Sequence, residues 1–230
     1  MEGILLVNKP IDWTSFDVVN YIRRIIAKEL DLKPTKVKVG HSGTLDPLAE
    51  GLLIILVGKT YTKRSNEFLK LDKNYHVSLQ LGLRSKSFDL GTETEQFSDK
   101  IPDLSAINTS LNFIKNQKDQ VPPNYSAIKI KGKRAYLKAR DGEEFIIKKR
   151  PIKVYSIDLV SYKYPILELD IEVSSGTYIR SIVNDIGENL GTGAVMTKLT
   201  RLSIANYKLM NAINLQDLDA EKIRKSLILI

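Results

Sequence analysis

The chain has 230 residues, and a hydrophobic share of 43% is enough for a soluble globular protein with one substantial core. Its 35 lysines and arginines exceed its 27 acidic residues, and the formal net charge of +8 favours a polyanionic partner such as nucleic acid, with a merely solvated basic surface as the alternative. The absence of cysteine excludes disulfides and thiolate metal sites, the two histidines show no metal-ligand spacing, and no apolar run could span a bilayer, so we expect a cytoplasmic protein without a metal.

The first sixty residues carry strand, helix and strand signals in turn. Residues 4–7 are a short apolar run before a turn, which indicates a strand. Thr14 or Ser15 can cap the helix that follows, because apolar residues then recur every three or four positions. The predicted apolar face of this helix consists of Val19, Ile22, Ile26 and Leu30. Residues 52–57 are continuously aliphatic and predict a strand buried on both faces.

The second part of the chain shows both periods again. Residues 76–83 alternate and predict a strand with one buried face. Its inward residues are expected to be Val77, Leu79, Leu81 and Leu83, and its outward residues His76, Ser78 and Gln80. Helical spacing of apolar residues predicts helices at 104–114 and 179–190. Residues 167–173 alternate aliphatic with acidic side chains, which predicts a half-exposed strand.

A basic segment at about 121–151 differs from the rest of the chain. It is rich in lysine and arginine, and Gly132 and Gly142 can act as bends, so the pattern predicts an arm or long hairpin that projects from the core. Four of its cations are candidate RNA contacts: Lys129, Lys131, Lys133 and Arg134. We find no repeat and no linker, and therefore predict a single mixed α+β domain over residues 1–230.

The stretch "GHSGTLDPLAEGLL", residues 40–53, contains a candidate catalytic residue. Asp46 precedes a proline and is therefore biased toward an extended backbone at a loop tip, which by itself is typical of a turn carboxylate. His41 lies five residues earlier, and a buried strand follows directly. A carboxylate kept ionised by nearby cations suits a nucleophile, so the sequence also allows a catalytic function.

Five segments together resemble one known family. They read "GILLVNKPIDWTS", "VGHSGTLDPLAEGLLIILVG", "LDKNYHVSLQLG", "VPPNYSAIKIKGKRAY" and "SSGTYIRSIVNDIGENLGTGA". They occur in the order seen in the TruB family of tRNA pseudouridine synthases, and the resemblance covers residues 3 to about 210. It implies the pseudouridine synthase fold: an α+β domain with a central mixed, mostly antiparallel sheet flanked by helices, and a basic thumb insertion.

The resemblance also implies an activity. Members isomerise uridine 55 in the T arm of tRNA to pseudouridine, and they do so by flipping the base out of its stack. The bond from N1 to the ribose is broken, the uracil rotates, and C5 is joined to the ribose instead. No cofactor, membrane or obligatory protein partner is implied, and a monomer is expected. Two alternatives remain open, a non-catalytic RNA-binding or tRNA-folding protein and a guide-dependent rRNA pseudouridine synthase.

Site residues follow from the same resemblance, position by position. Asp46 matches the catalytic aspartate, whose attack on the sugar C1′ or on the base is left open. Tyr75 matches a tyrosine that stacks on the target base and can assist proton transfer, and Arg180 matches the arginine that pairs with the aspartate. Leu199 matches an apolar residue near the flipped base, and His41 resembles the residue that fills the space left behind.

The remaining substrate contacts rest on the same basis. Tyr178 belongs to the substrate site, and the basic arm resembles the thumb that grips the T stem-loop through its phosphates. Taken singly, each residue has a plain structural alternative. Tyr75 and Tyr178 could be core aromatics with a satisfied hydroxyl. Arg180 could be a surface helix charge and His41 an ordinary loop residue.

Two departures from the family pattern stand out. Asp12 occupies a position where members usually have glycine, which puts the geometry of the first turn in question. Members commonly carry a small RNA-binding PUA domain after the catalytic domain, whereas only a short segment follows Ala212 in this sequence. We therefore expect a short form without a PUA domain.

Overall fold

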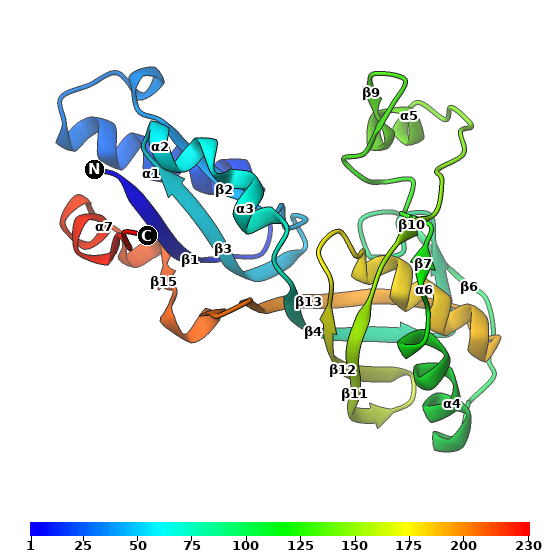
Figure 1. The fold of residues 1–230 in the computed structure, drawn as a ribbon. Coiled ribbons are helices and arrows are strands. Elements are labelled where there is room, and N and C mark those ends of the chain that lie inside the picture. Colours follow the sequence, from blue (N-terminus) through cyan, green and yellow to red (C-terminus); the bar gives the residue numbers. More distant parts are fainter. The chain divides into compact units, whose positions relative to one another are not determined.

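The computed structural model describes residues 1–230 (Figure 1). Their contacts divide the chain into two compact units, residues 1–75 with 199–230, and residues 76–198. Two strands, β4 (Lys73–Leu81) and β13 (Ala194–Ile204), pass from one unit into the other along the chain. None of the helices is long and apolar enough to cross a membrane.

Strand pairing in the first unit is mixed and mostly antiparallel, as predicted. At its centre β1 (Gly3–Lys9) and β3 (Ala49–Val57) run antiparallel, and β2 (Val39–Ser42) pairs antiparallel with β3. The end of β13 lies parallel to β3, and β15 (Ile213–Asn214) lies parallel to β1. A short β14 (Tyr207–Lys208) pairs antiparallel with β13.

Helices cover both faces of this part of the sheet. Side chains of α1 (Ser15–Glu29) and α7 (Ala220–Ser226) share a core cluster with Leu53, Ile55 and Val57 of β3. Aromatic residues of α2 (Lys59–Lys63) and α3 (Ser65–Leu69) share another with Leu52, Ile54 and Leu56. Because both faces are covered, consecutive aliphatic residues are all buried, which confirms the prediction for residues 52–57. Short 3₁₀ turns lie at Pro34–Lys36, Leu209–Asn211 and Leu215–Asp217.

Helix α1 begins where the sequence predicts. The hydroxyl of Thr14 accepts a hydrogen bond from the backbone N of Asp17 (3.1 Å), and the Asp17 carboxylate accepts one from the backbone N of Thr14 (2.9 Å). The predicted residues Val19, Ile22 and Ile26 are buried. The prediction for Leu30 is wrong, because α1 ends at Glu29 and the chain turns away, leaving Leu30 43% exposed.

The strands of the second unit lie in the order β11 (Val154–Lys163), β12 (Ile166–Val173), β4 and β13. Two helices, α4 (Leu104–Lys115) and α6 (Ile179–Leu190), pack on each other, and α4 packs on β11 (Figure 1). Beside them β5 (Leu83–Ser85) and β6 (Thr94–Gln96) form a small hairpin. The aliphatic residues of β12 are buried while its acidic residues keep contact with solvent, which confirms the predicted half-exposed strand.

Two residues of the predicted strand at 76–83 behave differently from the alternation. Ser78 was expected outward but is buried, and both its carbonyl and its hydroxyl are hydrogen-bonded to the hydroxyl of Thr197 on β13 (3.0 and 3.2 Å). Leu83 was expected inward but is half-buried and belongs to β5, because Gly82, with φ +93°, redirects the chain. The buried residues Val77, Leu79 and Leu81 agree with the prediction.

The basic segment forms an arm that stands away from the rest of the second unit (Figure 1). Its base is the antiparallel pair β7 (Asp119–Gln120) and β10 (Arg150–Pro151). Its outer part consists of β8 (Lys129–Ile130), β9 (Lys133–Arg134) and α5 (Ala135–Arg140). Gly132 and Gly142 have positive φ values at its bends, so the predicted arm is confirmed.

Candidate functional site

Asp46 lies on the loop between β2 and β3, and both sides of this loop are fixed. The hydroxyl of Ser15 accepts a hydrogen bond from the backbone N of Leu45 (2.9 Å) and donates one to its carbonyl (3.1 Å). On the other side of the loop, the backbone N of Ala49 donates to the carbonyl of Asp46 (3.0 Å). The start of α1 and the start of β3 therefore hold the loop backbone at the half-buried Asp46 in place.

The first turn of the chain packs against the same loop. The backbone N of Asp12 donates to the carbonyl of Pro47 (2.8 Å), and the buried ammonium of Lys9 donates to the carbonyls of Trp13 (2.6 Å) and Pro47 (3.4 Å). Asp12 has φ +65°, in the left-handed region that glycine adopts without strain. The turn therefore keeps a glycine-like geometry although an aspartate stands there.

Basic groups surround this loop, and burial alters their protonation. Burial lowers the pKa of Lys9 to about 8, while the nearby Asp46 carboxylate opposes the shift. Burial also lowers the pKa of Lys73 to about 8, and the charge of Arg201 adds to the effect. Burial and then the same Arg201 charge lower the pKa of His41. Lys9, Lys73 and Arg201 therefore provide basic groups close to the Asp46 loop, although burial lowers the pKa of each.

Three further predicted site residues belong to the same unit. Tyr75, on β4, is buried, and it lies near enough to Arg201 to oppose the lowering of the Arg201 pKa by burial. Leu199, on β13, is buried and pairs in register with Ala49 at the end of the Asp46 loop. His41, on β2, is half-buried, and its Nδ1 atom is buried without a hydrogen-bond partner.

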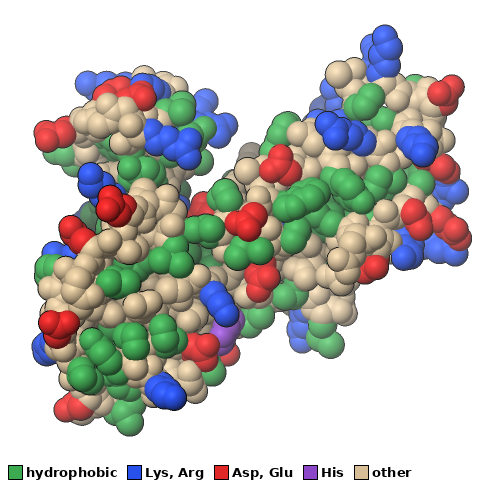
Figure 2. Space-filling model, turned by 180° about the vertical axis from the view of Figure 1, so that it is seen from behind, with side chains coloured by type: hydrophobic (Ala, Val, Ile, Leu, Met, Phe, Trp, Pro, Cys, Tyr) green, Lys and Arg blue, Asp and Glu red, His purple; other side chains and the backbone are tan.

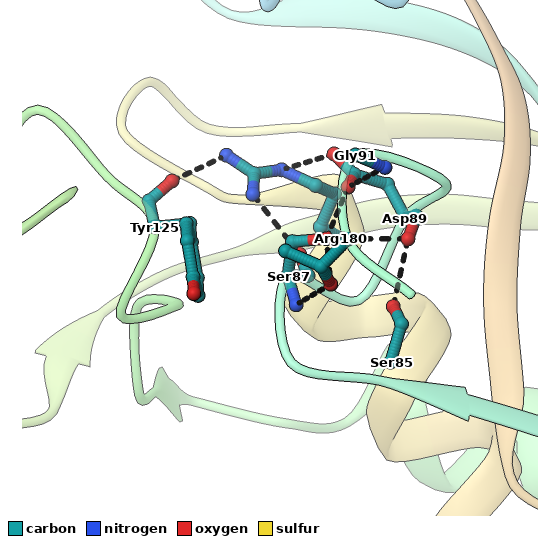
Figure 3. Close-up of polar contacts among 7 residues, drawn as sticks. Ser85, Ser87, Asp89, Gly91, Tyr125 and Arg180 are labelled. Carbon is teal, nitrogen blue, oxygen red and sulfur yellow. Dashed lines mark hydrogen bonds and ion pairs between the residues drawn. The ribbon is translucent and has the colours of Figure 1, made fainter. Parts of the chain in front are cut away.

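Arg180 lies in the second unit, in the first turn of α6. Only 4% of it is exposed, so the alternative of a surface helix charge is wrong. Its guanidinium donates to the carbonyls of Ser87 and Tyr125 (both 3.0 Å), and its Nε atom lies 3.5 Å from the Asp89 carboxylate (Figure 3). An arginine fork held at several points is fixed in orientation, which a lysine could not reproduce.

Asp89 is itself buried and firmly held. Its Oδ1 atom accepts hydrogen bonds from the hydroxyl of Ser87 (2.5 Å) and the backbone N of Gly91 (2.9 Å), and its carbonyl accepts one from the hydroxyl of Ser85 (2.7 Å) (Figure 3). Sequence reasoning missed this residue. The available signal was the turn pattern of "SFDLG", in which a serine stands two positions before the aspartate and a glycine two positions after it.

Tyr178 is the N-cap residue of α6 and is half-buried. Its backbone N donates to the side-chain oxygen of Gln120 (2.8 Å), and its carbonyl accepts from the amide nitrogen of the same residue (3.0 Å). Gln120 belongs to β7 at the base of the arm. The beginning of α6, which carries Arg180, is therefore tied to the arm.

The four candidate cations of the arm fall into two groups. Lys133 forms ion pairs with Asp141 (2.5 Å) and Glu143 (2.9 Å), and Lys138 also pairs with Glu143. Blue and red side chains accordingly lie side by side on the arm (Figure 2). The exposed cations, none of which forms such a pair, are Lys129, Lys131 and Arg134. Lys133 therefore carries less uncompensated charge than these three.

Arg201 was also missed by sequence reasoning, although a signal was present. It follows Leu199 by two positions on β13 and so shares its buried face. It is 1% exposed and the largest fully buried side chain of the protein. No group of three or more His, Asp and Glu side chains is arranged so that it could hold a metal ion.

Sequence comparison defines the class of protein. Residues 28–179 match the profile of the TruB family pseudouridylate synthase (N terminal domain), and residues 180–227 match that of the tRNA pseudouridylate synthase B C-terminal domain. The two matches leave only the ends of the chain uncovered and define a pseudouridylate synthase. The chain belongs to the TruB family, and the predicted α+β pseudouridine synthase fold is confirmed.

Individual relatives agree with this. The tRNA pseudouridine synthase B of Clostridium kluyveri is 42% identical over 99% of this chain and 76% of its own length. That of Phocaeicola vulgatus is 39% identical over 97% of both chains. Among solved structures, a Cbf5-Nop10-Gar1 complex is similar with a TM-score of 0.70 and 28% identity. This similarity covers 94% of the chain but 53% of that chain, so the protein spans about half its length.

Proposed function

We propose that this protein is a tRNA pseudouridine synthase that isomerises uridine 55 in the T arm of tRNA. The observation that carries the proposal is the family match over residues 28–227, within which Asp46 lies on a loop held from both sides. Relatives that are 39–42% identical over nearly the whole chain are tRNA pseudouridine synthases B. The similarity to the Cbf5 complex is lower, at 28% identity, which favours direct action on tRNA over guide-dependent action.

The proposed chemistry uses three side chains. The Asp46 carboxylate attacks the target nucleoside, Tyr75 supports the flipped base, and Arg180 orients the carboxylate in the complex with RNA. The bond between N1 and C1′ breaks, the uracil rotates, and a bond between C5 and C1′ forms. C5 loses a hydrogen and N1 gains one, so the product is an isomer of the substrate and no co-reactant is consumed.

Base flipping assigns roles to two more residues. The extruded uridine leaves a space in the T loop, and loss of its stacking costs on the order of a few kcal/mol. His41 fills that space, and its buried Nδ1 atom supports this role because RNA can supply the hydrogen-bond partner that the free protein lacks. Leu199 packs beside the flipped base, close to the Asp46 loop.

The arm supplies phosphate contacts. Its exposed cations Lys129, Lys131 and Arg134 bind the T stem-loop, with smaller contributions from Lys133 and from the Tyr178 region at the base. We further propose that residues 1–230 act as one catalytic domain, as a monomer, in the cytoplasm, and without an obligatory protein partner.

The proposal is tested with purified protein and unmodified tRNA, without a guide RNA or other proteins. We expect the wild-type protein to form pseudouridine at position 55. In Asp46→Asn the rate of its formation should fall at least about a thousandfold. The variant should bind tRNA within about tenfold of wild type, because the amide is nearly isosteric. Glu50→Gln, which removes an exposed carboxylate near the same loop, is the control and should retain the rate within about threefold.

Three outcomes would contradict the proposal. Binding of tRNA without any pseudouridine would indicate an RNA-binding or tRNA-folding protein. Product that forms only when a guide RNA is added would indicate the guide-dependent class. Multiple turnover by pure Asp46→Asn, with deamidation to aspartate excluded by mass spectrometry, would remove Asp46 from the mechanism.

A further inference from the structure

Arg201 is a buried cation that the proposed chemistry does not use. Its position is set by the parallel register of β13 on β3, in which Arg201 lies opposite Gly51. Gly51 has φ +106°, and a Cβ atom there would approach the carbonyl oxygen of Arg201 to 2.5 Å. Only glycine therefore lets the two backbones come this close. This close approach places Arg201 next to the Asp46 loop.

The guanidinium of Arg201 binds both ends of that loop. Its Nε atom donates to the carbonyl of Leu52 (2.7 Å), and its Nη2 atom donates to the carbonyl of Gly43 (2.9 Å). Residues 43 and 52 bracket Asp46 on its two sides. The Tyr75 side chain lies near the same guanidinium and opposes the lowering of its pKa by burial. One planar group with five donors thus connects the two ends of the loop of the proposed nucleophile.

The acceptors of Arg201 are uncharged, unlike those of a typical buried ion pair. Both are backbone carbonyls. A buried arginine costs considerable free energy of desolvation, and an apolar side chain of similar volume would avoid that cost. Its two hydrogen bonds, one on each side of Asp46, give a reason for an arginine at this position.

We propose that Arg201 is a positioning residue of the isomerisation, which fixes the two ends of the Asp46 loop in one arrangement. This inference rests on the proposed function. It assigns no contact between Arg201 and the RNA, so the residue acts on the chemical step through the loop, and tRNA affinity depends little on it.

The test compares Arg201→Lys with wild type in single-turnover assays at saturating enzyme. A lysine keeps the positive charge but cannot reach both carbonyls at once from a planar group, so we expect the rate to fall at least about thirtyfold. The dissociation constant for tRNA should stay within about threefold. Arg23→Lys is the matched control, because Arg23 also donates to a backbone carbonyl, that of Val39 (3.0 Å), and it should keep the rate within about threefold.

A double-mutant cycle distinguishes positioning from a general structural effect. If Arg201 acts by fixing the Asp46 loop, the combined rate loss of Arg201→Lys and Ser15→Ala, which frees Leu45 of the same loop, should be clearly smaller than the product of the two separate losses. All chains are assayed at a temperature at which circular dichroism shows them folded. Arg201→Gln serves as a second variant, with an expected loss at least as large as that of Arg201→Lys.

Several results would overturn the inference. These are a wild-type rate in Arg201→Lys, a loss of affinity as large as the loss of rate, and a combined loss in the double variant with Ser15→Ala that equals the product of the separate losses. If neither Arg201 variant folds, the residue serves the fold alone, and the inference also fails. Wild-type protein in the same assay keeps the two proposals apart, since absence of pseudouridine there would reject the proposed function instead.

Discussion

Arg180 and Arg201 are both almost fully buried, each donates to two backbone carbonyls, and yet only Arg180 has a carboxylate beside it. The Asp89 carboxylate lies 3.5 Å from Nε of Arg180, whereas both hydrogen-bond acceptors of Arg201 are uncharged carbonyls. The second unit therefore compensates its buried cation, and the first unit leaves its own uncompensated near the Asp46 loop. An uncompensated cation raises the local positive potential, which supports the nucleophilic role that we propose for Asp46.

The same contrast recurs at the surface of the arm. Lys133 is paired with two carboxylates, while Lys131 is exposed and forms no ion pair. A cation that is already paired releases fewer counterions when it meets RNA, because its charge is partly neutralised beforehand. The position of carboxylates, and not the number of cations, therefore decides where the protein presents positive charge.

The largest expected effect tests the compensation of Arg180. Asp89→Asn leaves that cation buried without its carboxylate, so we expect the free energy of unfolding to fall by about 3 kcal/mol, measured by urea denaturation. Glu50→Gln removes an exposed carboxylate of the first unit, and it should change the free energy of unfolding by less than about 0.5 kcal/mol. Equal effects of the two substitutions would mean that Asp89 does not compensate Arg180.

The second prediction concerns the cations around Asp46. The pKa of Lys73 is about 8 in the folded protein and about 10.5 for an ordinary lysine, so the unfolded state binds more protons between these pH values. Stability should therefore rise from pH 8 to pH 10.5. Over this range the free energy of unfolding of wild type should rise by at most about 3 kcal/mol relative to that of Lys73→Met, measured by urea denaturation at each pH. A constant difference between the two chains would contradict the lowered pKa.

The arm offers a smaller effect with a matched pair of variants. Lys131→Gln should reduce the slope of log K against log salt for tRNA binding by about 0.7 to 0.9, because one phosphate contact is lost. Lys133→Gln should reduce it by clearly less, since Asp141 and Glu143 already neutralise that charge. The slopes come from titrations at four or more salt concentrations. A larger change of slope in Lys133→Gln than in Lys131→Gln would contradict the proposal that the unpaired cations of the arm make the stronger phosphate contacts.

The smallest expected effect concerns the strained turn beside the Asp46 loop. Asp12→Gly should raise the free energy of unfolding by about 0.5 to 1 kcal/mol, because glycine adopts φ +65° without strain. Asp12→Ala keeps the strain and should give no gain, which makes it the control. Equal gains in both variants, measured by urea denaturation, would assign the effect to the lost charge and not to the backbone.

Much of the fold follows from local patterns. The period of the apolar residues is enough to predict α1, α4 and α6, and alternation is enough to predict β12. The cap at Thr14 consists of two hydrogen bonds between residues three positions apart, so it too can be predicted from the sequence. Alternation fails at Ser78, because Thr197, more than a hundred positions later, buries it.

For the candidate site, the sequence by itself determined the family and the residues that match it, since the segments around Asp46, Tyr75 and Arg180 are contiguous and specific. Only the tertiary structure decided how the charges are compensated. Asp89 reaches Arg180 across 91 positions, and Arg201 reaches Gly43 across 158. Such partners depend on strand register and on buried backbone carbonyls, which are set by the packing of the whole chain and leave no periodic trace in the sequence.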